Sequence, residues 1–248
     1  MNIAFFITED YSFMYPLLNT LLPKLKNKHR VVGVAHFPDT LVGLKGVQIP
    51  LKYLELFGIV TTVKLAARNI KDRASVPSFG QMIRHKSIRY AGFNSPNDEE
   101  VIRWIKNIHT DIIFIFIGNV LRKDIIEAPR CCIINKHASI LPSNRGILPV
   151  FWAMLKDEKI GFSLHKVTEQ LDSGEVLFQR EYGKEDLSLY EWYRKIYADL
   201  PDAILHCIER AEMKNTPLMV NPNVVPSYNS LPERRGVKLF YQKGRKII

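Results

Sequence analysis

Short apolar runs alternate with amphipathic segments along most of this chain. The strongest strand signal is the apolar run from Asp111 to Ile117, which is typical of a central, buried strand of a parallel sheet. Other apolar runs predict strands at 2–7, 31–36, 131–134, 161–167 and 175–181. Helical spacing predicts helices at 12–27, 97–108, from 150 to 155 and at 188–212, where Pro201 is expected to cause a kink or break.

This alternation of strands and helices predicts an α/β fold with a Rossmann-like, doubly wound and mostly parallel sheet. We expect residues 1–212 to form the main domain, with a helical insert at about 50–90. Residues 213–248 are expected to form a basic, proline-containing C-terminal tail or small subdomain, packed over the domain as turns and a short hairpin. Ligands of such sheets bind at the carboxyl ends of the strands.

The insert contains an unusual helix-like run at 51–67, which is apolar almost all round. A helix of this kind is usually buried or lies at a dimer interface, and we expect one of these two placements. A helix that lies on a membrane surface is the alternative interpretation.

The net charge of the chain is compatible with binding to an anionic partner. The chain carries a formal charge of +10, and the excess lies in 51–90 and 213–248. A nucleotide, a phosphorylated sugar, RNA or an acidic membrane surface would each suit this distribution, although solvated surface charge explains it equally well.

The spacing of the cysteines and the length of the apolar segments indicate the cellular compartment. The three cysteines form no Cys-x-x-Cys pair, so we expect a reducing cytoplasm and no metal site. The first residues are too short and uncharged for a signal peptide, and no apolar segment is long enough to span a bilayer. We therefore expect a cytoplasmic protein.

Three polar residues indicate acyl-transfer chemistry. Asn135 and His137 follow an apolar run and lie two residues apart, so an extended chain points both side chains to one face. Asp172 arrives after another strand-like run. An amide can stabilise an oxyanion, an imidazole can move a proton, and a carboxylate can orient the imidazole. The other histidines, His165 included, are interpreted as structural.

The motifs around these residues resemble those of the folate-dependent formyltransferases. The matching segments are Asn135-Lys136-His137-Ala138-Ser139-Ile140-Leu141-Pro142, Arg145-Gly146 and Leu171-Asp172-Ser173-Gly174. That family includes methionyl-tRNA, glycinamide ribonucleotide and sugar N-formyltransferases. The resemblance implies the formyltransferase fold, a one-carbon transfer from 10-formyltetrahydrofolate, and catalytic roles for Asn135, His137 and Asp172. It implies folate contacts at Gly118, Asn119, Leu121, Ile126, Val167, Thr168, Glu169 and Gln170.

Differences between this sequence and the members of that family limit which acceptor molecule we expect. Glu9 and Asp10 follow the first strand, where ribonucleotide-type relatives carry a glycine-rich phosphate loop, so that acceptor is not expected. The segment after residue 212 is expected to be too short for the C-terminal domain of the tRNA-type relatives. We expect the acceptor to be a primary amine on a nucleotide-linked amino sugar or a similar small molecule, and we do not expect nucleic acid as a partner. A homodimer is a further expectation. The alternatives are a methionyl-tRNA formyltransferase-like enzyme, a 10-formyltetrahydrofolate hydrolase, and an inactive homologue that binds folate.

Overall fold

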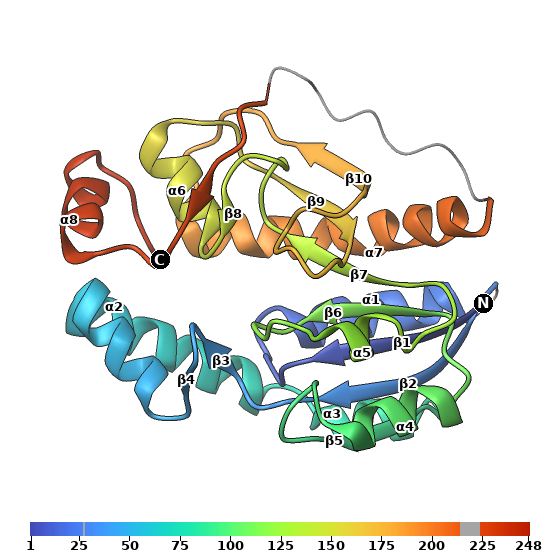
Figure 1. The fold of residues 1–248 in the computed structure, drawn as a ribbon. Helices are drawn as coiled ribbons and strands as arrows, with labels where there is room; N and C mark the ends of the chain where they lie inside the picture. The colour runs from blue at the N-terminus through green and yellow to red at the C-terminus, as the bar shows by residue number, and fades with distance from the viewer. Residues whose placement is uncertain (27, 214–223) are drawn as a thin grey trace.

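A computed structural model describes residues 1–26, 28–213 and 224–248 (Figure 1). Within these ranges the main sheet has seven strands, in the spatial order β10-β9-β7-β6-β1-β2-β5. These strands are β1 (Asn2–Ile7), β2 (Arg30–His36), β5 (Arg89–Gly92), β6 (Ile112–Phe116), β7 (Cys132–His137), β9 (Gly161–Lys166) and β10 (Val176–Glu181). Two small ladders join β3 (Thr40–Leu41) to β4 (Leu44–Lys45) and β8 (Arg145–Gly146) to β11 (Tyr228–Asn229). The helices are α1 (Met14–Leu25), α2 (Gln48–Ala74), α3 (Phe79–Arg84), α4 (Glu99–Asn107), α5 (Lys123–Ile126), α6 (Pro149–Lys156), α7 (Leu189–Met213) and α8 (Arg234–Gln242).

The sheet is mostly parallel, as the alternation of elements predicts. β1 pairs in parallel with β2 on one side and with β6 on the other, and β5 and β7 extend the two sides in parallel. β9 and β10 are antiparallel additions next to β7. Because the connections run to opposite sides of β1, the strand order reverses between β1 and β6, where doubly wound sheets leave a crevice for ligands.

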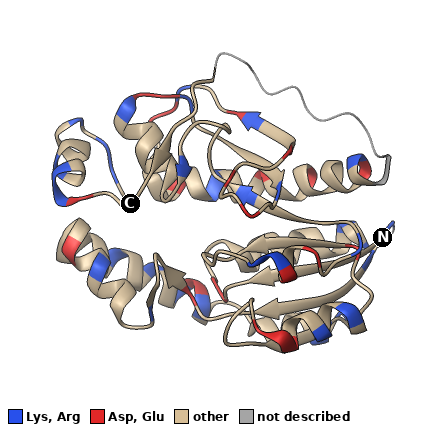
Figure 2. Cartoon of the chain, in the orientation of Figure 1, with Lys and Arg blue, Asp and Glu red and all other residues tan. Residues whose placement is uncertain are grey.

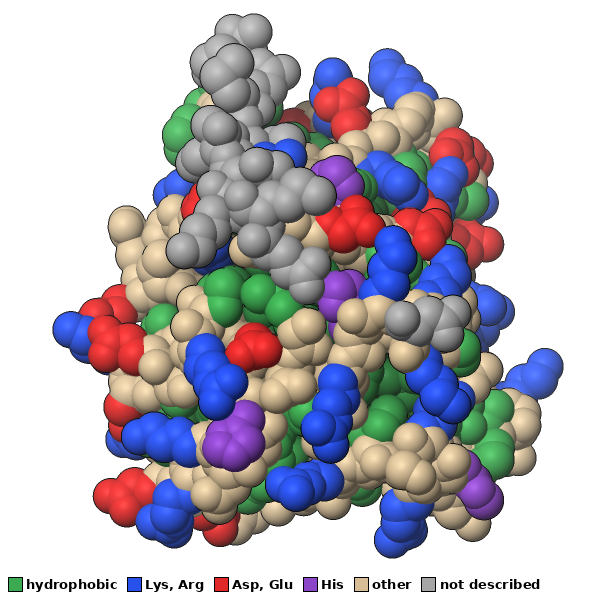
Figure 3. Space-filling view, turned by 90° about the vertical axis from the view of Figure 1, so that its right-hand side faces the viewer, with side chains coloured by type: hydrophobic (Ala, Val, Ile, Leu, Met, Phe, Trp, Pro, Cys, Tyr) green, Lys and Arg blue, Asp and Glu red, His purple; other side chains and the backbone are tan. Residues whose placement is uncertain are grey.

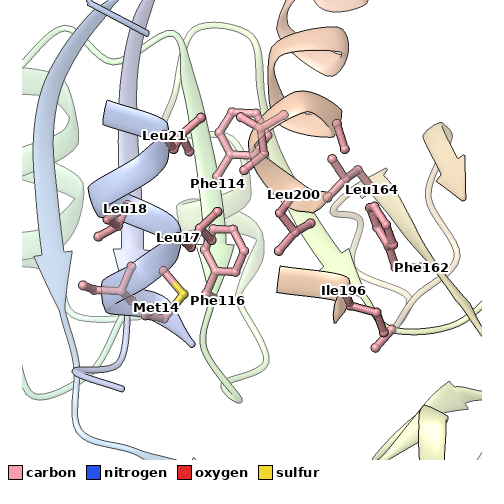
Figure 4. Packing of buried hydrophobic residues seen from close by; sticks show 14 of the residues in the cluster. Met14, Leu17, Leu18, Leu21, Phe114, Phe116, Phe162, Leu164, Ile196 and Leu200 are labelled. Atoms are coloured by element: carbon pink, nitrogen blue, oxygen red, sulfur yellow. The ribbon is translucent and has the colours of Figure 1, made fainter. Parts of the chain in front are cut away.

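Helices cover both faces of the sheet, so alternate residues of each strand enter different cores. Phe5 of β1 packs on one face, beneath α1 and α7, whereas Phe6 packs on the other face, with Val101 and Ile105 of α4. Figure 4 shows the first of these cores, in which Leu17 of α1 lies close to the ring of Phe116. The two cores hold the strands rigidly enough to fix the side chains at their carboxyl ends.

Tertiary packing changes two of the expected elements. α7 runs from Leu189 to Met213 through Pro201 as one helix, so the expected break is wrong. The helix buries Ile196, Leu200 and Ile204 against the sheet, and this packing offsets the hydrogen bond that proline lacks. The end of the expected helical insert is a strand, β5, at the edge of the sheet.

The described part of the C-terminal tail contains no hairpin. Its residues 224–248 form β11, which pairs in parallel with β8, and then helix α8. α8 docks because it buries Val237 and Phe240, and the Phe240 ring stacks on Phe151 with centroids 4.5 Å apart. Pro217 and Pro222 lie outside the described residues. The boundary at residue 212 stays a prediction.

The helix of the insert lies on the surface of the chain. α2 bends at Gly58, whose φ of 78° is in the left-handed region that favours glycine. This fully described helix buries just Ile49, Leu56 and Phe57, so the expectation that the apolar run is buried within the chain is wrong. Figure 1 shows α2 at one end of the molecule, below α8.

Within the three described ranges, the structure contains no helix that is both long and apolar enough to cross a membrane.

Candidate active site

The three residues expected to act in catalysis line one cavity. This cavity of about 630 Å³ lies at the carboxyl ends of β6 and β7. Asn135 and His137 reach it from the same face of β7, and Asp172 reaches it from the loop between β9 and β10. Asp172 follows His137 by 35 residues, and it meets Asn135 and His137 because β9, which leads into its loop, pairs with β7.

The imidazole of His137 has an oxygen atom near each nitrogen. Nε2 lies 2.8 Å from the carbonyl oxygen of Asn144, and Nδ1 lies 3.6 Å from Oδ2 of Asp172. A carbonyl oxygen can only accept, so Nε2 carries a hydrogen and Nδ1 is the nitrogen that can take up a proton. Burial lowers the pKa of His137, while the Asp172 carboxylate and the Asn144 carbonyl oppose that effect. The ring is neutral at pH 7, and its cation would have a partner on each side.

Asp172 is held by a turn whose backbone suits the aspartate and glycine of its local sequence. Its φ is 49°, a left-handed value that aspartate tolerates better than most residues. Its Oδ2 accepts a hydrogen bond from the backbone N of Gly146 at 2.9 Å. At Gly174 a Cβ would overlap the carbonyl oxygen of Lys166, so glycine is required where the turn packs against the end of β9. The Asp-x-Gly motif therefore fixes the carboxylate next to His137.

His165 belongs to the same cluster. β9 runs antiparallel to β7 and places His165 directly opposite Asn135. Its Nδ1 lies 2.9 Å from the carbonyl oxygen of Lys166, so Nδ1 carries the hydrogen. Its Nε2 lies 3.3 Å from Nδ2 of Asn135 and 3.6 Å from Oδ1 of Asp172. Burial lowers the pKa of His165 to about 4, so the ring is neutral and Nε2 accepts a hydrogen bond from the Asn135 amide.

Sequence reasoning missed His165 because its place in the site depends on how β9 is aligned with β7 in the sheet. The spacing within β7 reveals Asn135 and His137, but nothing within β9 shows which residue of β7 faces His165. The pairing of the two strands supplies that information.

Most of the residues expected to contact folate line the cavity. Six do so: Gly118, Asn119, Leu121, Val167, Thr168 and Glu169. Two do not: Ile126 packs against the core beneath α4 and α5, and the backbone of Gln170 accepts hydrogen bonds from Thr168 and Ser173. A Cβ at Gly118 would lie 2.5 Å from the carbonyl oxygen of Thr40, so the glycine lets the loop at 40–45 close one wall.

The cavity matches the chemistry of a flat, polar-edged ligand. Its volume is within the range of small-molecule sites, and Leu121, Val167 and Leu171 supply apolar walls beside the backbone of the two loops. Within residues 1–26, 28–213 and 224–248, no group of three or more His, Cys, Asp or Glu side chains is arranged to hold a metal ion. The arrangement can donate a hydrogen bond from Asn135 and accept a proton at His137, which is what an acyl transfer to an amine requires.

Comparison with known proteins identifies the family. The sequence model described as formyl transferase matches residues 1–184. The chain belongs to the formyl transferase family. This membership confirms the family predicted from the motifs.

Curated relatives of this formyl transferase chain are methionyl-tRNA formyltransferases. The protein from Bacillus cytotoxicus is 28% identical over 227 residues, which cover 91% of this chain and 60% of the relative. The protein from Fusobacterium nucleatum is 35% identical over 123 residues, which cover 47% of this chain and 40% of the relative. The chain thus spans about half the length of these relatives.

Solved structures of formyltransferases share the fold. A sugar N-formyltransferase from a Shewanella species has a TM-score of 0.57 at 15% identity, covering 93% of this chain and 77% of that one. Glycinamide ribonucleotide transformylase 1 from Symbiobacterium toebii has a TM-score of 0.61 at 15% identity, covering 92% and 94%. A sugar 3N-formyl transferase solved in the presence of dTDP and 5-N-formyl-THF has a TM-score of 0.57 at 15% identity, covering 93% and 69%. These likenesses confirm the predicted fold class.

The C-terminal segment of this formyl transferase family member supports the site. Ser227 Oγ accepts a hydrogen bond from the backbone N of Asn144 at 2.8 Å. Asn229 Nδ2 donates to Oδ1 of Asn144 at 2.7 Å, and Lys156 Nζ donates to the side-chain oxygens of both Asn144 and Asn229. The backbone oxygen of Asn144 in turn accepts from His137. β11 therefore fixes the loop that positions His137.

A lysine that sequence reasoning did not single out lies between Asn135 and His137 on β7. Lys136 has its Nζ 4.7 Å from the centre of the Tyr197 ring and 5.8 Å from that of Tyr193, both on α7. Burial lowers the pKa of Lys136 to about 8, and the negative charge of Asp10 opposes this effect. This ammonium group is therefore readily deprotonated compared with a surface lysine.

A second cavity of about 640 Å³ lies next to the first, at the ends of β1, β2 and β5. Its wall includes four acidic residues, Glu9, Asp10, Asp39 and Glu100. Burial raises the pKa of Asp10 and of Asp39. Asp39 lines this cavity and its neighbour Thr40 lines the first cavity, so the loop after β2 separates the two.

Proposed function

We propose that this chain transfers a formyl group from 10-formyltetrahydrofolate to the primary amine of a small-molecule acceptor. The observation that carries the proposal is the meeting of Asn135, His137 and Asp172 at one cavity whose walls are the loops expected to bind the donor. Family membership supports the same reaction.

The donor would occupy the cavity at the ends of β6 and β7. The loop at Gly118 and Asn119 and the loop at Val167 to Glu169 offer backbone N–H and C=O groups, which suit the alternating donors and acceptors of a pterin edge. When bound, the donor supplies the formyl carbon that the acceptor amine attacks.

Asn135 would stabilise the negative charge that develops on the formyl oxygen. Its Nδ2 has two hydrogens, and the contact with His165 engages one of them. The other is free to donate to the oxygen. His137 would take the amine proton at Nδ1, and the carboxylate of Asp172 at 3.6 Å would stabilise the imidazolium that forms. His137 would then return this proton to the donor nitrogen as the bond between that nitrogen and the formyl carbon breaks, which releases tetrahydrofolate and the formylated amine.

The first acceptor class to test is a nucleotide-linked amino sugar. The likeness in fold to sugar N-formyltransferases, one of them solved with dTDP, supports this class. The acid-lined cavity next to the site favours an ammonium group over a phosphate, so free amino sugars and diamines form a second class. Methionyl-tRNA is a further acceptor to test, because the curated relatives carry that name.

Donor turnover tests the proposal. The full chain is incubated with 10-formyltetrahydrofolate and each acceptor, and tetrahydrofolate formation is followed over time. Amine-dependent turnover is expected, with a loss on the order of 10²–10³ in rate for Asn135→Ala. Asn107→Ala at the exposed end of α4 is the matched control and should keep the wild-type rate.

The remaining outcomes separate the alternatives. Formate release without any amine would identify a hydrolase. Turnover that depends on methionyl-tRNA alone would identify the tRNA-type enzyme. Donor binding measured by calorimetry with no turnover for any acceptor would indicate a folate-binding homologue and contradict the proposal.

A further inference from the structure

The second half of helix α2 carries an apolar face that no part of the described chain covers. Ile59, Val63 and Ile70 are spaced by four and seven residues, so they lie on one side of the helix, and Val60 lies beside them. Their exposed fractions are 66%, 57%, 67% and 65%. Alanines at 66, 67 and 74 fill the spaces between them. Exposed apolar side chains in such a continuous stripe mark an interaction surface.

Basic residues border this face on both sides. Lys64 and Lys71 lie along one edge and are exposed. Arg73 lies along the other edge and is also exposed, with its guanidinium 5.6 Å from the centre of the Tyr11 ring. The one acidic residue of this half, Asp72, points toward the body of the protein, where it accepts hydrogen bonds from Ser12 and Tyr190. The face is therefore apolar in the middle and positive at its margins.

The first half of α2 continues the exposed apolar surface. Val47, the residue just before α2, and Leu51 and Leu54 within it are again spaced by four and three residues, and their exposed fractions are 76%, 61% and 40%. Val42, in the turn before the helix, is 56% exposed. That turn belongs to the loop that closes the catalytic cavity, so a partner on α2 would lie close to the site.

α2 is attached firmly enough to present this face. Tyr241 of α8 contacts α2 through its hydroxyl, which lies 3.3 Å from Thr61 Oγ1 and 3.4 Å from the carbonyl oxygen of Phe57. Nearer the C-terminal end of α2, Arg68 lies over the ring of Tyr190 at 4.7 Å. These contacts tie the second half of α2 to the domain, just after the bend at Gly58 and again at Arg68, while the residues of the apolar face stay exposed.

We propose that α2 docks this protein on an anionic lipid bilayer surface. An interfacial helix combines an apolar face with flanking Lys and Arg, because the apolar side chains enter the acyl boundary and the cations contact the lipid phosphates. Figure 2 shows blue segments on both α2 and α8, which lie at the same end of the molecule, together with red segments at Glu55 of α2 and at Glu233, the N-cap of α8. The opposite end, which faces the viewer in Figure 3, mixes basic and acidic side chains and resembles an ordinary solvated surface.

The charges around the apolar face of α2 favour a bilayer over a second copy of the chain as the binding partner. If two copies packed through this apolar face, the basic residues that border the face in one copy would lie next to those of the other copy. This half of the helix has no free carboxylate to pair with them, because its one acidic residue, Asp72, accepts a hydrogen bond from Ser12. Like charges at an interface oppose association. A bilayer that contains anionic lipids supplies both the apolar layer and the negative charge.

Vesicle sedimentation tests the proposal with the full chain. The protein is mixed with vesicles of phosphatidylglycerol and phosphatidylcholine in equal parts, and separately with vesicles of phosphatidylcholine alone. Binding to the anionic vesicles is expected. The double variant Val63→Glu/Ile70→Glu should abolish it, and Lys64→Glu/Lys71→Glu should weaken it by about tenfold or more.

Matched controls exclude a general effect of charge. Lys106→Glu/Lys123→Glu makes the same change in net charge on α4 and α5, and Val225→Glu changes an exposed apolar residue elsewhere. Both should bind like the wild type. Failure of the wild type to bind anionic vesicles, or equal binding by the α2 variants, would overturn the proposal. Light scattering that shows a dimer split by Val63→Glu/Ile70→Glu would assign the face to a second copy instead. Formyl transfer is assayed separately, so either result leaves the proposed reaction untouched.

Discussion

The Nε2 atom of His165 accepts a hydrogen bond from the side-chain nitrogen of Asn135, across the pairing of β9 with β7, at 3.3 Å. This contact orients the amide, because it places the Asn135 nitrogen on the side of His165 and leaves one N–H for the cavity. An amide that was free to rotate would present its oxygen to the cavity for part of the time.

Replacing His165 should therefore slow the chemical step. His165→Leu removes the acceptor, and we expect kcat to fall about tenfold or more while donor affinity changes little. His165→Gln keeps an oxygen that can accept from Asn135 and should recover part of the rate. Steady-state kinetics with donor binding measured by calorimetry would check this. Equal rates for wild type and His165→Leu would contradict the positioning role.

Replacing Asp172 by asparagine should change both rate and pH dependence. Asp172 raises the pKa of His137, so the charge-removing variant should lower that pKa further. The acid limb of the profile of kcat/KM against pH should then move to lower pH, and kcat should fall by about 10² or more. A profile that keeps its acid limb would show that His137 does not govern it.

The buried histidine should also make stability depend on pH. The pKa of His165 is about 4 in the folded chain and near 6.5 in an unfolded one, so acid protonates the unfolded chain first. The free energy of unfolding should fall between pH 7 and pH 5, with His165 contributing on the order of 1–2 kcal/mol. Urea denaturation at both values should show a smaller fall for His165→Gln. His85→Gln, at an exposed histidine, should behave like the wild type.

The C-terminal segment should matter to catalysis as well as stability. Asn229→Ala removes the buried amide that contacts Asn144, and it should lower the free energy of unfolding by about 1–3 kcal/mol. It should also lower kcat, because the Asn144 carbonyl positions His137. Ser230→Ala, at the exposed neighbouring residue, is the control. If the variant is destabilised but keeps the wild-type kcat at low temperature, the C-terminal segment stabilises the fold without positioning His137.

The local sequence determined much of the fold and the centre of the site. Unbroken apolar character at 112–116 specifies a buried strand, because no polar face remains for solvent. The two-residue spacing of Asn135 and His137 gives them a common face in any extended strand. The Asp172 turn is specified by the aspartate at a left-handed position and by Gly174, both of which act within a few residues.

Tertiary structure decided what depends on partners that are distant in sequence. Pro201 stays inside one helix because the buried face of α7 outweighs its local preference. His165 joins the site through strand register, and Asn229 supports it through a pairing with β8; neither register can be read from one segment alone. The apolar run at 51–67 has the composition of a buried helix, yet it is exposed because the sheet is already covered by α1 and α7 on one face and by α4 and α5 on the other. Periodicity thus reports which side of an element is apolar, whereas only the assembled fold shows whether another element is there to cover it.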